Sequence, residues 1–297
     1  PKAIAALEKI GADIISSPDL KAEELSEAID NANVLIVRST KVYAETIEAG
    51  KSLELIIRAG AGVNNIDLEK ASNSGVYVAN CPGKNSDAVA ELTLGHIIAC
   101  DRRIVDASLD LRSGNWKKKA YQKAAGLKGR TLGIIGLGSI GSALAKLAKG
   151  LDMNVIAWSR SLTSDKADKL DLIYCESITE VAANADVVSV HLAVTPDTKQ
   201  LLNTDFFNKM KDGAIFVNTS RGEIVNTAAL HKAIDEKALR VGLDVFENEP
   251  GSGFAEFDQT DLADLITCTP HIAASTNQAS EAIADEVVRI VDSLIKT

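Results

Sequence analysis

Short apolar runs of strand length alternate with helical stretches along the whole chain. Several of these runs are apolar at consecutive positions, whereas a strand with one solvated face alternates apolar and polar residues. Strands that helices cover on both faces have the consecutive pattern, so the sequence predicts an α/β fold of doubly wound parallel sheets. We expect strands at residues 33–37, 54–58, 76–79, 131–135, 154–158, 186–190, 214–218, 241–245 and 265–268.

The succession of strands pauses between Ser86 and Gly129. This part of the sequence predicts a long helix at 88–104, followed by a polar and basic stretch at 112–130. A last amphipathic helix is expected at 277–295. Because a chain of 297 residues is long enough for two domains, a domain boundary fits this pause.

The overall composition is that of an ordinary globular protein, with 46% hydrophobic residues and a net charge of −9. The acidic balance argues against a general nucleic-acid binder, which needs a basic face. The four cysteines stand singly, without the spacing of metal ligands, so we expect no metal. No apolar run approaches the roughly 20 residues of a membrane span, and no signal peptide is recognised, so we expect no membrane partner and a cytoplasmic location.

One glycine motif carries a specific chemical meaning. Gly136, Gly138 and Gly141 form G-x-G-x-x-G directly after a predicted strand, with Ser139 and Ile140 inside the motif at the start of a predicted helix. In this context the motif predicts a dinucleotide site, in which the glycine backbone approaches the pyrophosphate and the helix N-terminus binds it.

The residue that would bind the ribose is unusual. An acidic side chain is expected at the end of the second strand of the motif, where it would bind the ribose hydroxyls. This chain has Ser159 and Arg160 there. An arginine flanked by hydroxyls suits a 2′-phosphate, so NADP is a second candidate beside NAD; the alternative is that Arg160 is a solvated surface residue.

Hydride transfer to or from an alcohol needs a group that exchanges protons near neutral pH, and histidine is the usual one. His271 follows a predicted strand and a proline, and is the best candidate for the acid/base; His96, inside an apolar helix, reads as a core residue. Arg221 and Glu249 also follow predicted strands, where a guanidinium could bind a substrate carboxylate and a carboxylate could orient His271. His191, at another strand end, could line the cofactor site.

The stretches "GLGSIG", "HLAVTPDT", "NTSRG", "GLDVFENEP" and "TPHIAAST" resemble those of the D-isomer-specific 2-hydroxyacid dehydrogenases, and the resemblance covers essentially the whole chain. It implies that Arg221 binds the 2-keto acid, that Glu249 supports His271 and that His271 is the acid/base. It also implies that Asp244 contacts the nicotinamide, and it places Thr219 and Ala273 among the cofactor-binding residues.

The family resemblance implies a Rossmann domain at 99–272, inserted into a flavodoxin-like substrate domain formed by 1–98 and 273–297. The substrate would lie in the cleft between them, and the protein would be a homodimer through the Rossmann domain. The strand that the family places before residue 1 is missing from the given sequence, so either the substrate sheet is one strand short or this strand lies outside the sequence. We also expect no C-terminal regulatory domain like that of longer relatives.

Within the family, the resemblance is greatest to the members that oxidise D-3-phosphoglycerate in serine synthesis. A phosphorylated substrate needs cations besides Arg221, and Arg38, Lys41 and Arg58 are the candidates. Gly60 and Asn85 are the other residues of this domain that we expect to bind the substrate. The main alternative is a glyoxylate or hydroxypyruvate reductase, which an NADP-type ribose site would suit. A remote alternative is a non-catalytic corepressor that senses dinucleotides.

Overall fold

The computed structural model describes residues 2–250 and 255–296 and divides the chain into two compact units. Unit 1 contains the residues up to Asn85 together with those from Ser275 onward, and unit 2 contains Ser86–Ala274. The expected first boundary at residue 98 falls inside helix α5 (Ser86–Arg102), whereas the observed boundary precedes this helix. The reason is packing, because Ala90, Ile97 and Cys100 of α5 belong to the core of unit 2.

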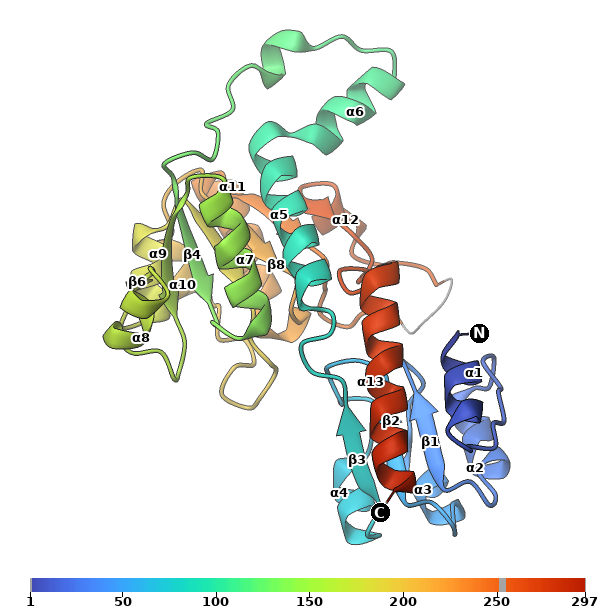
Figure 1. Ribbon diagram of the computed structural model, residues 1–297. Helices are drawn as coiled ribbons and strands as arrows, with labels where there is room; N and C mark the ends of the chain where they lie inside the picture. The colour runs from blue at the N-terminus through green and yellow to red at the C-terminus, as the bar shows by residue number, and fades with distance from the viewer. Residues whose placement is uncertain (1, 251–254, 297) are drawn as a thin grey trace. The chain divides into compact units, whose positions relative to one another are not determined.

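Unit 1 is a parallel sheet covered on both faces by helices (Figure 1). Its strands lie in the order β1-β2-β3: β1 (Val34–Val37), β2 (Leu55–Arg58) and β3 (Tyr77–Asn80). Ile56 of β2 packs into the cluster under α2 (Leu25–Ala28), α3 (Ala44–Ala49) and α4 (Leu68–Asn73), with the short turn η1 (Ala22–Glu24) before α2. Leu55 and Ile57 pack on the other face, against α1 (Lys2–Lys9) and α13 (Asn277–Ile295). Burial on both faces explains the unbroken apolar run in β2.

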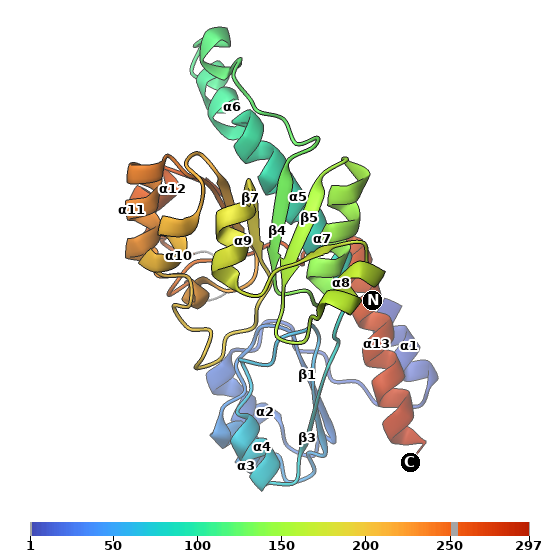
Figure 2. The ribbon, with the colours of Figure 1, turned by 90° about the vertical axis from the view of Figure 1, so that its left-hand side faces the viewer.

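Unit 2 is a parallel sheet of seven strands, in the order β10-β9-β8-β7-β4-β5-β6. Figure 2 shows β7, β4 and β5 side by side in this sheet. The strands are β4 (Thr131–Ile135), β5 (Asn154–Trp158), β6 (Ile173–Tyr174), β7 (Val187–Val190), β8 (Ile215–Asn218), β9 (Arg240–Leu243) and β10 (Thr267–Cys268). Its helices are α5, α6 (Ile104–Arg112), α7 (Ser139–Gly150), α8 (Ser164–Lys169), α9 (Ile178–Asn184), α10 (Thr204–Lys209), α11 (Thr227–Lys237) and α12 (Thr260–Ala263), with short turns η2 (Lys118–Tyr121) and η3 (Gly222–Ile224). The strand order reverses between β4 and β7, and this switch point is where open α/β sheets bind ligands.

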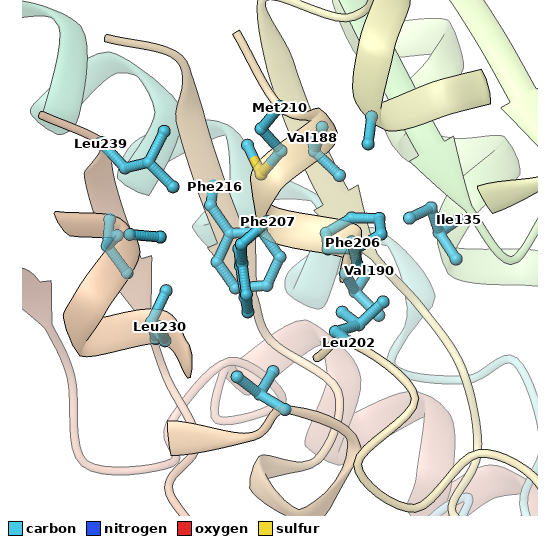
Figure 3. Packing of buried hydrophobic residues seen from close by; sticks show 14 of the residues in the cluster. Ile135, Val188, Val190, Leu202, Phe206, Phe207, Met210, Phe216, Leu230 and Leu239 are labelled. Carbon is cyan, nitrogen blue, oxygen red and sulfur yellow. The ribbon is translucent and has the colours of Figure 1, made fainter. Parts of the chain in front are cut away.

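The larger core of unit 2 lies between the sheet and helices α9, α10 and α11. Figure 3 shows Phe206, Phe207 and Phe216 at its centre, among aliphatic side chains from β7 and α11. Phe207 meets both of the other rings edge to face, with 5.3 Å between centroids. This arrangement suits the quadrupoles of aromatic rings and supports the strands whose ends carry the site residues.

The predicted doubly wound α/β fold is confirmed, and every expected strand is present within two residues of its predicted limits. The two-residue strand β6 was not expected, because it is too short to leave a hydrophobic pattern. The expected helix at 88–104 ends two residues earlier, because Arg103 adopts a left-handed conformation, with φ of 51°, that separates α5 from α6. The predicted last helix at 277–295 matches α13.

Candidate functional site

The glycine motif forms the turn between β4 and α7, at the switch point of the sheet. Gly136 has φ of +98°, and a Cβ on it would lie 2.3 Å from the carbonyl oxygen of His191. A Cβ on Gly141 would lie 2.3 Å from the carbonyl oxygen of Gly136, so the first turn of α7 can pack on the loop only without a side chain there. A side chain at either position would displace the start of α7 from the strand ends.

The turn fits the pyrophosphate of a dinucleotide. Gly138 is exposed and caps α7, and a Cβ built on it meets no atom within 4 Å, so the backbone has open space beside it. Ser139 and Ile140 form the first turn of α7, whose free N–H groups favour an anion. These residues therefore suit the cofactor that the motif predicts.

His191 lies directly after β7 and against the glycine turn. Its Nε2 is 2.9 Å from the hydroxyl of Ser189, and its buried Nδ1 has no hydrogen-bond partner in the described part of the chain. Burial lowers the pKa of His191 to about 4, so the ring is neutral at physiological pH. A buried ring nitrogen without a protein partner, beside the phosphate turn, is consistent with the predicted cofactor contact.

Ser159 and Arg160 directly follow β5. The N–H of Gly136 donates to the carbonyl of Trp158 over 2.8 Å, which holds the end of β5 beside the glycine turn. Arg160 is exposed, and no side-chain hydrogen bond or ion pair to it is found among the described residues. Ser159, which is half-buried, therefore stands where a ribose-binding acid is expected, and the exposed Arg160 follows it.

Arg221, Glu249 and His271 follow three neighbouring strands of unit 2, namely β8, β9 and β10. The Nδ1 of His271 is 2.6 Å from Oε2 of Glu249, and Oε1 of Glu249 accepts from the N–H of Phe246 over 2.9 Å. The imidazole side chain of His271 is 47% exposed. Arg221 is half-buried, and its Nη1 donates to the carbonyl of Ser220 over 2.7 Å.

The His271–Glu249 pair shifts both groups toward their charged forms. The hydrogen bond that His271 donates to Glu249 raises the pKa of His271, against the effect of burial and of the neighbouring Arg221. Burial opposes the charge of Glu249, but hydrogen bonds from His271 and the N–H of Phe246 outweigh it and lower the pKa of Glu249. The pair therefore favours an imidazolium whose Nε2 remains available to a substrate.

Asp244 is fully buried, and its carboxylate binds the backbone of the His271 loop. Oδ1 accepts from the N–H of Ile272 over 2.9 Å, and Oδ2 accepts from the N–H of Ala273 over 2.8 Å. Asp244 and Ala273 are both expected to bind the cofactor, and in the structure they form a hydrogen bond with each other. Thr219 is likewise buried, with its hydroxyl 2.8 Å from that of Thr93.

Two further residues in this region, Thr269 and His96, are not recognisable as part of the site from the sequence. Oδ1 of Asp244 also accepts from the hydroxyl of Thr269 over 2.5 Å, and the same hydroxyl is 3.0 Å from Nε2 of His96. Thr269 opens the stretch "TPHIAAST", but nothing in that stretch assigns a role to its hydroxyl, and His96 belongs to no motif. His96 is buried, as its apolar helix predicts, but it is connected to the His271 loop.

In unit 1, the predicted substrate residues lie at the carboxyl ends of the parallel strands. Arg58 ends β2, opposite Val37 and Asn80, while Arg38 and Lys41 follow β1 and are exposed. The guanidinium of Arg58 lies over the backbone of Gly60, where a Cβ would be 1.5 Å from its Nη1.

Asn85 ends unit 1 and is half-buried. It follows Lys84, which pairs with Glu286 of α13 over 3.2 Å. Through that pair, helix α13 fixes the loop that carries Asn85.

Two negative observations apply to residues 2–250 and 255–296. None of the helices in these ranges has the length and apolar character needed to cross a membrane. No group of three or more histidine, cysteine, aspartate or glutamate side chains in the same ranges is placed to bind a metal ion.

Comparison with curated proteins gives relatives with two kinds of names. The chain is 41% identical over 281 residues to a hydroxypyruvate reductase of Thermotoga maritima, covering 92% of this chain and 88% of the relative. It is 38% identical over 296 residues to a D-3-phosphoglycerate dehydrogenase of Methanocaldococcus jannaschii, covering 97% of this chain and 55% of the relative. The chain thus spans about half the length of that dehydrogenase.

Solved structures have the same fold. The chain matches a 3-phosphoglycerate dehydrogenase of Entamoeba histolytica with bound NAD⁺ at a TM-score of 0.82 and 27% identity, over 100% of this chain and 91% of the other. The family model described as "D-isomer specific 2-hydroxyacid dehydrogenase, NAD binding domain" matches residues 94–273. The fold, the glycine turn at the switch point and these matches show that the chain belongs to the D-isomer-specific 2-hydroxyacid dehydrogenases, NAD-dependent oxidoreductases.

Proposed function

We propose that this enzyme interconverts D-3-phosphoglycerate and 3-phosphohydroxypyruvate, the first step of serine synthesis. The observation that carries the proposal is the set of cations at the carboxyl edge of unit 1, where Arg38 and Lys41 accompany Arg58. A small unphosphorylated 2-keto acid has a single anionic group, for which Arg221 suffices. A second anionic group gives the cations of unit 1 a chemical purpose.

In the proposed reduction, Arg221 binds the substrate carboxylate through its guanidinium. His271 donates a proton from Nε2 to the carbonyl oxygen, and in oxidation it accepts the hydroxyl proton. Glu249 keeps the other ring nitrogen protonated and fixes the orientation of the ring. Bound NAD supplies or accepts the hydride, and the glycine turn with Gly138, Ser139 and Ile140 would hold its pyrophosphate.

A glyoxylate or hydroxypyruvate reductase is the second candidate. It is supported by the 41% identity to the Thermotoga maritima protein of that name and by Ser159 and Arg160 in place of a ribose-binding acid. The two candidates differ in whether a phosphate on the substrate is recognised, and this difference can be measured directly.

The first prediction concerns the substrate. We expect a higher kcat/KM for 3-phosphohydroxypyruvate than for glyoxylate or hydroxypyruvate, each measured with NADH and with NADPH. Arg58→Gln should raise KM for 3-phosphohydroxypyruvate about 10- to 100-fold, as expected for the loss of a charge-assisted hydrogen bond. It should leave the kinetics with glyoxylate nearly unchanged. A preference for glyoxylate, with no effect of Arg58→Gln on either substrate, would establish the reductase instead.

The second prediction concerns pH. Reduction needs protonated His271, so kcat/KM for reduction should fall as pH rises through the pKa of this residue, which Glu249 raises. Glu249→Gln removes the carboxylate that raises this pKa, and the decline should begin at lower pH. Glu256→Gln, an exposed carboxyl of the same segment, is the matched control. An unchanged profile in Glu249→Gln would exclude the pair as the acid/base unit.

The third prediction concerns the cofactor. If Arg160 binds a 2′-phosphate, Arg160→Ala should weaken NADPH binding about 10- to 150-fold and leave NADH binding nearly unchanged. Dissociation constants from fluorescence titration measure this without turnover, and Lys169→Ala on α8 is the control for loss of a nearby exposed cation. We expect NAD to be used with incomplete exclusion of NADP. A preference for NADH above about 10³ in kcat/KM, which needs about 4 kcal/mol, would contradict this expectation.

The fourth prediction concerns assembly into a homodimer through unit 2. Helix α6 projects from the rest of unit 2 in both ribbon views and buries none of its residues (Figures 1 and 2). Residues 102–130 carry nine Lys or Arg and two Asp in a chain of net charge −9, and Trp116 is 79% exposed. A second copy of the acidic chain suits this basic and apolar segment. Light scattering at micromolar concentration should give a mass of about twice 31.4 kDa for the wild type. Trp116→Asp should lower the measured mass. A wild-type mass of 31.4 kDa would refute the dimer.

A further inference from the structure

A line of buried polar groups runs through unit 2 from helix α5 to the His271 loop. It comprises Nε2 of His96, the hydroxyl of Thr269 and Oδ1 of Asp244, joined over 3.0 and 2.5 Å. His96 and Asp244 are 3% and 0% exposed, so water does not compete for these bonds. All three residues lie within unit 2.

The donors and acceptors along this line can be assigned. The carboxylate of Asp244 accepts from the N–H groups of Ile272 and Ala273, and it also accepts the single hydroxyl proton of Thr269. The oxygen of Thr269 must then accept from His96, so the proton of the neutral imidazole is on Nε2. Burial lowers the pKa of His96, partly offset by the charge of Asp244, which faces it, and this favours the neutral ring.

The packing around His96 supports this arrangement. Residue 242 of β9 is a glycine, and a Cβ there would lie 2.9 Å from Cβ of His96. The absence of a side chain at Gly242 lets α5 approach β9 and brings the imidazole to Thr269. Helix α5 therefore contacts the His271 loop through the hydrogen bond between His96 and Thr269. Its apolar residues pack in the core of unit 2 as well.

The line ends on the backbone that orients His271. The main-chain oxygen of Asp244 accepts from the N–H of His271 over 2.8 Å, while its side chain holds the next two N–H groups. His271 itself has φ of 51°, a conformation that is uncommon for a residue with a side chain. Such a conformation persists where surrounding contacts enforce it, and Asp244 supplies three of them.

We propose that His96 and Thr269 are positioning residues for His271. They orient the carboxylate of Asp244, which fixes the backbone of 271–273 and so keeps the imidazole of His271 within hydrogen-bond distance of Glu249. The charged groups that face His271 are Glu249, Arg221 and Asp244. The proposal rests on the proposed role of His271 for its effect on turnover, but its effect on the state of His271 is independent of that role.

The fifth prediction tests this line with Thr269→Val and Thr269→Ser, which differ in the hydroxyl. Valine removes both hydrogen bonds, and kcat should fall about 10- to 100-fold, as expected for a misplaced catalytic group. In an NMR titration, the pKa of His271 should fall below that of the wild type as its contact with Glu249 loosens. Serine should restore both readouts to near wild type, with thermal unfolding measured for each variant.

His96 provides the second arm of the test. His96→Leu should shift kcat and the His271 titration in the same direction as Thr269→Val. The double variant should be no worse than Thr269→Val alone, because His96 acts only through Thr269. His96→Gln, which keeps an N–H donor, should retain more of the wild-type behaviour than His96→Leu.

Three results separate the outcomes. The proposal fails if Thr269→Val lowers thermal stability but leaves the His271 titration unchanged, or if the effects of His96→Leu and Thr269→Val add. If His271→Asn retains turnover within tenfold of wild type, the assigned role of His271 fails instead. In that case the NMR titration still decides whether the line positions His271.

Discussion

The buried carboxylate of Asp244 is the constraint on which the conformation of the His271 loop depends. A carboxylate removed from water is costly unless its oxygens accept hydrogen bonds. The carboxylate of Asp244 accepts them from the loop after β10, through the hydroxyl of Thr269 and the N–H groups of Ile272 and Ala273. The loop must therefore fold back over the end of β9. That requirement places His271 beside Glu249, and it explains how a histidine in a left-handed conformation can be held in place.

A second constraint is the parallel sheet itself. All strands of each sheet run in the same direction, so every carboxyl end in a unit lies at the same edge. Residues as distant in sequence as Gly136 and His271 are therefore brought to one edge of unit 2. The switch between β4 and β7 then separates two neighbouring loops and leaves room for the glycine turn beside His191.

The strands and the residues at their carboxyl ends could be predicted from the sequence, because hydrophobic periodicity and motif context determine them. Unbroken apolar runs identified the buried parallel strands, and strand-end positions singled out Arg221, Glu249 and His271, whose strands proved to be neighbours. The limits of α5 and the line from His96 to Asp244 were missed for a common reason. The end of α5 depends on the backbone conformation of the single residue Arg103, and the line from His96 depends on the close approach of α5 to Gly242. Neither feature leaves a periodic pattern in the sequence. His96 looks like a core residue because it is one, and only its partner Thr269 reveals a second role.

The replacement of the ribose-binding acid by Ser159 changes electrostatics more than it changes hydrogen bonding. A carboxylate at this position attracts the two ribose hydroxyls of NAD and repels a 2′-phosphate. A serine hydroxyl can still bond the ribose, although a neutral hydrogen bond is worth about 0.5–1.5 kcal/mol against about 1.5–3 kcal/mol for a charged one. We therefore expect a modest loss in NAD affinity, together with the loss of the repulsion that a carboxylate would exert on the 2′-phosphate of NADP. Arg160 stands next in the chain and has no acid to pair with among the described residues. We therefore expect the Ser159–Arg160 pair to reduce the difference between the affinities for NAD and NADP.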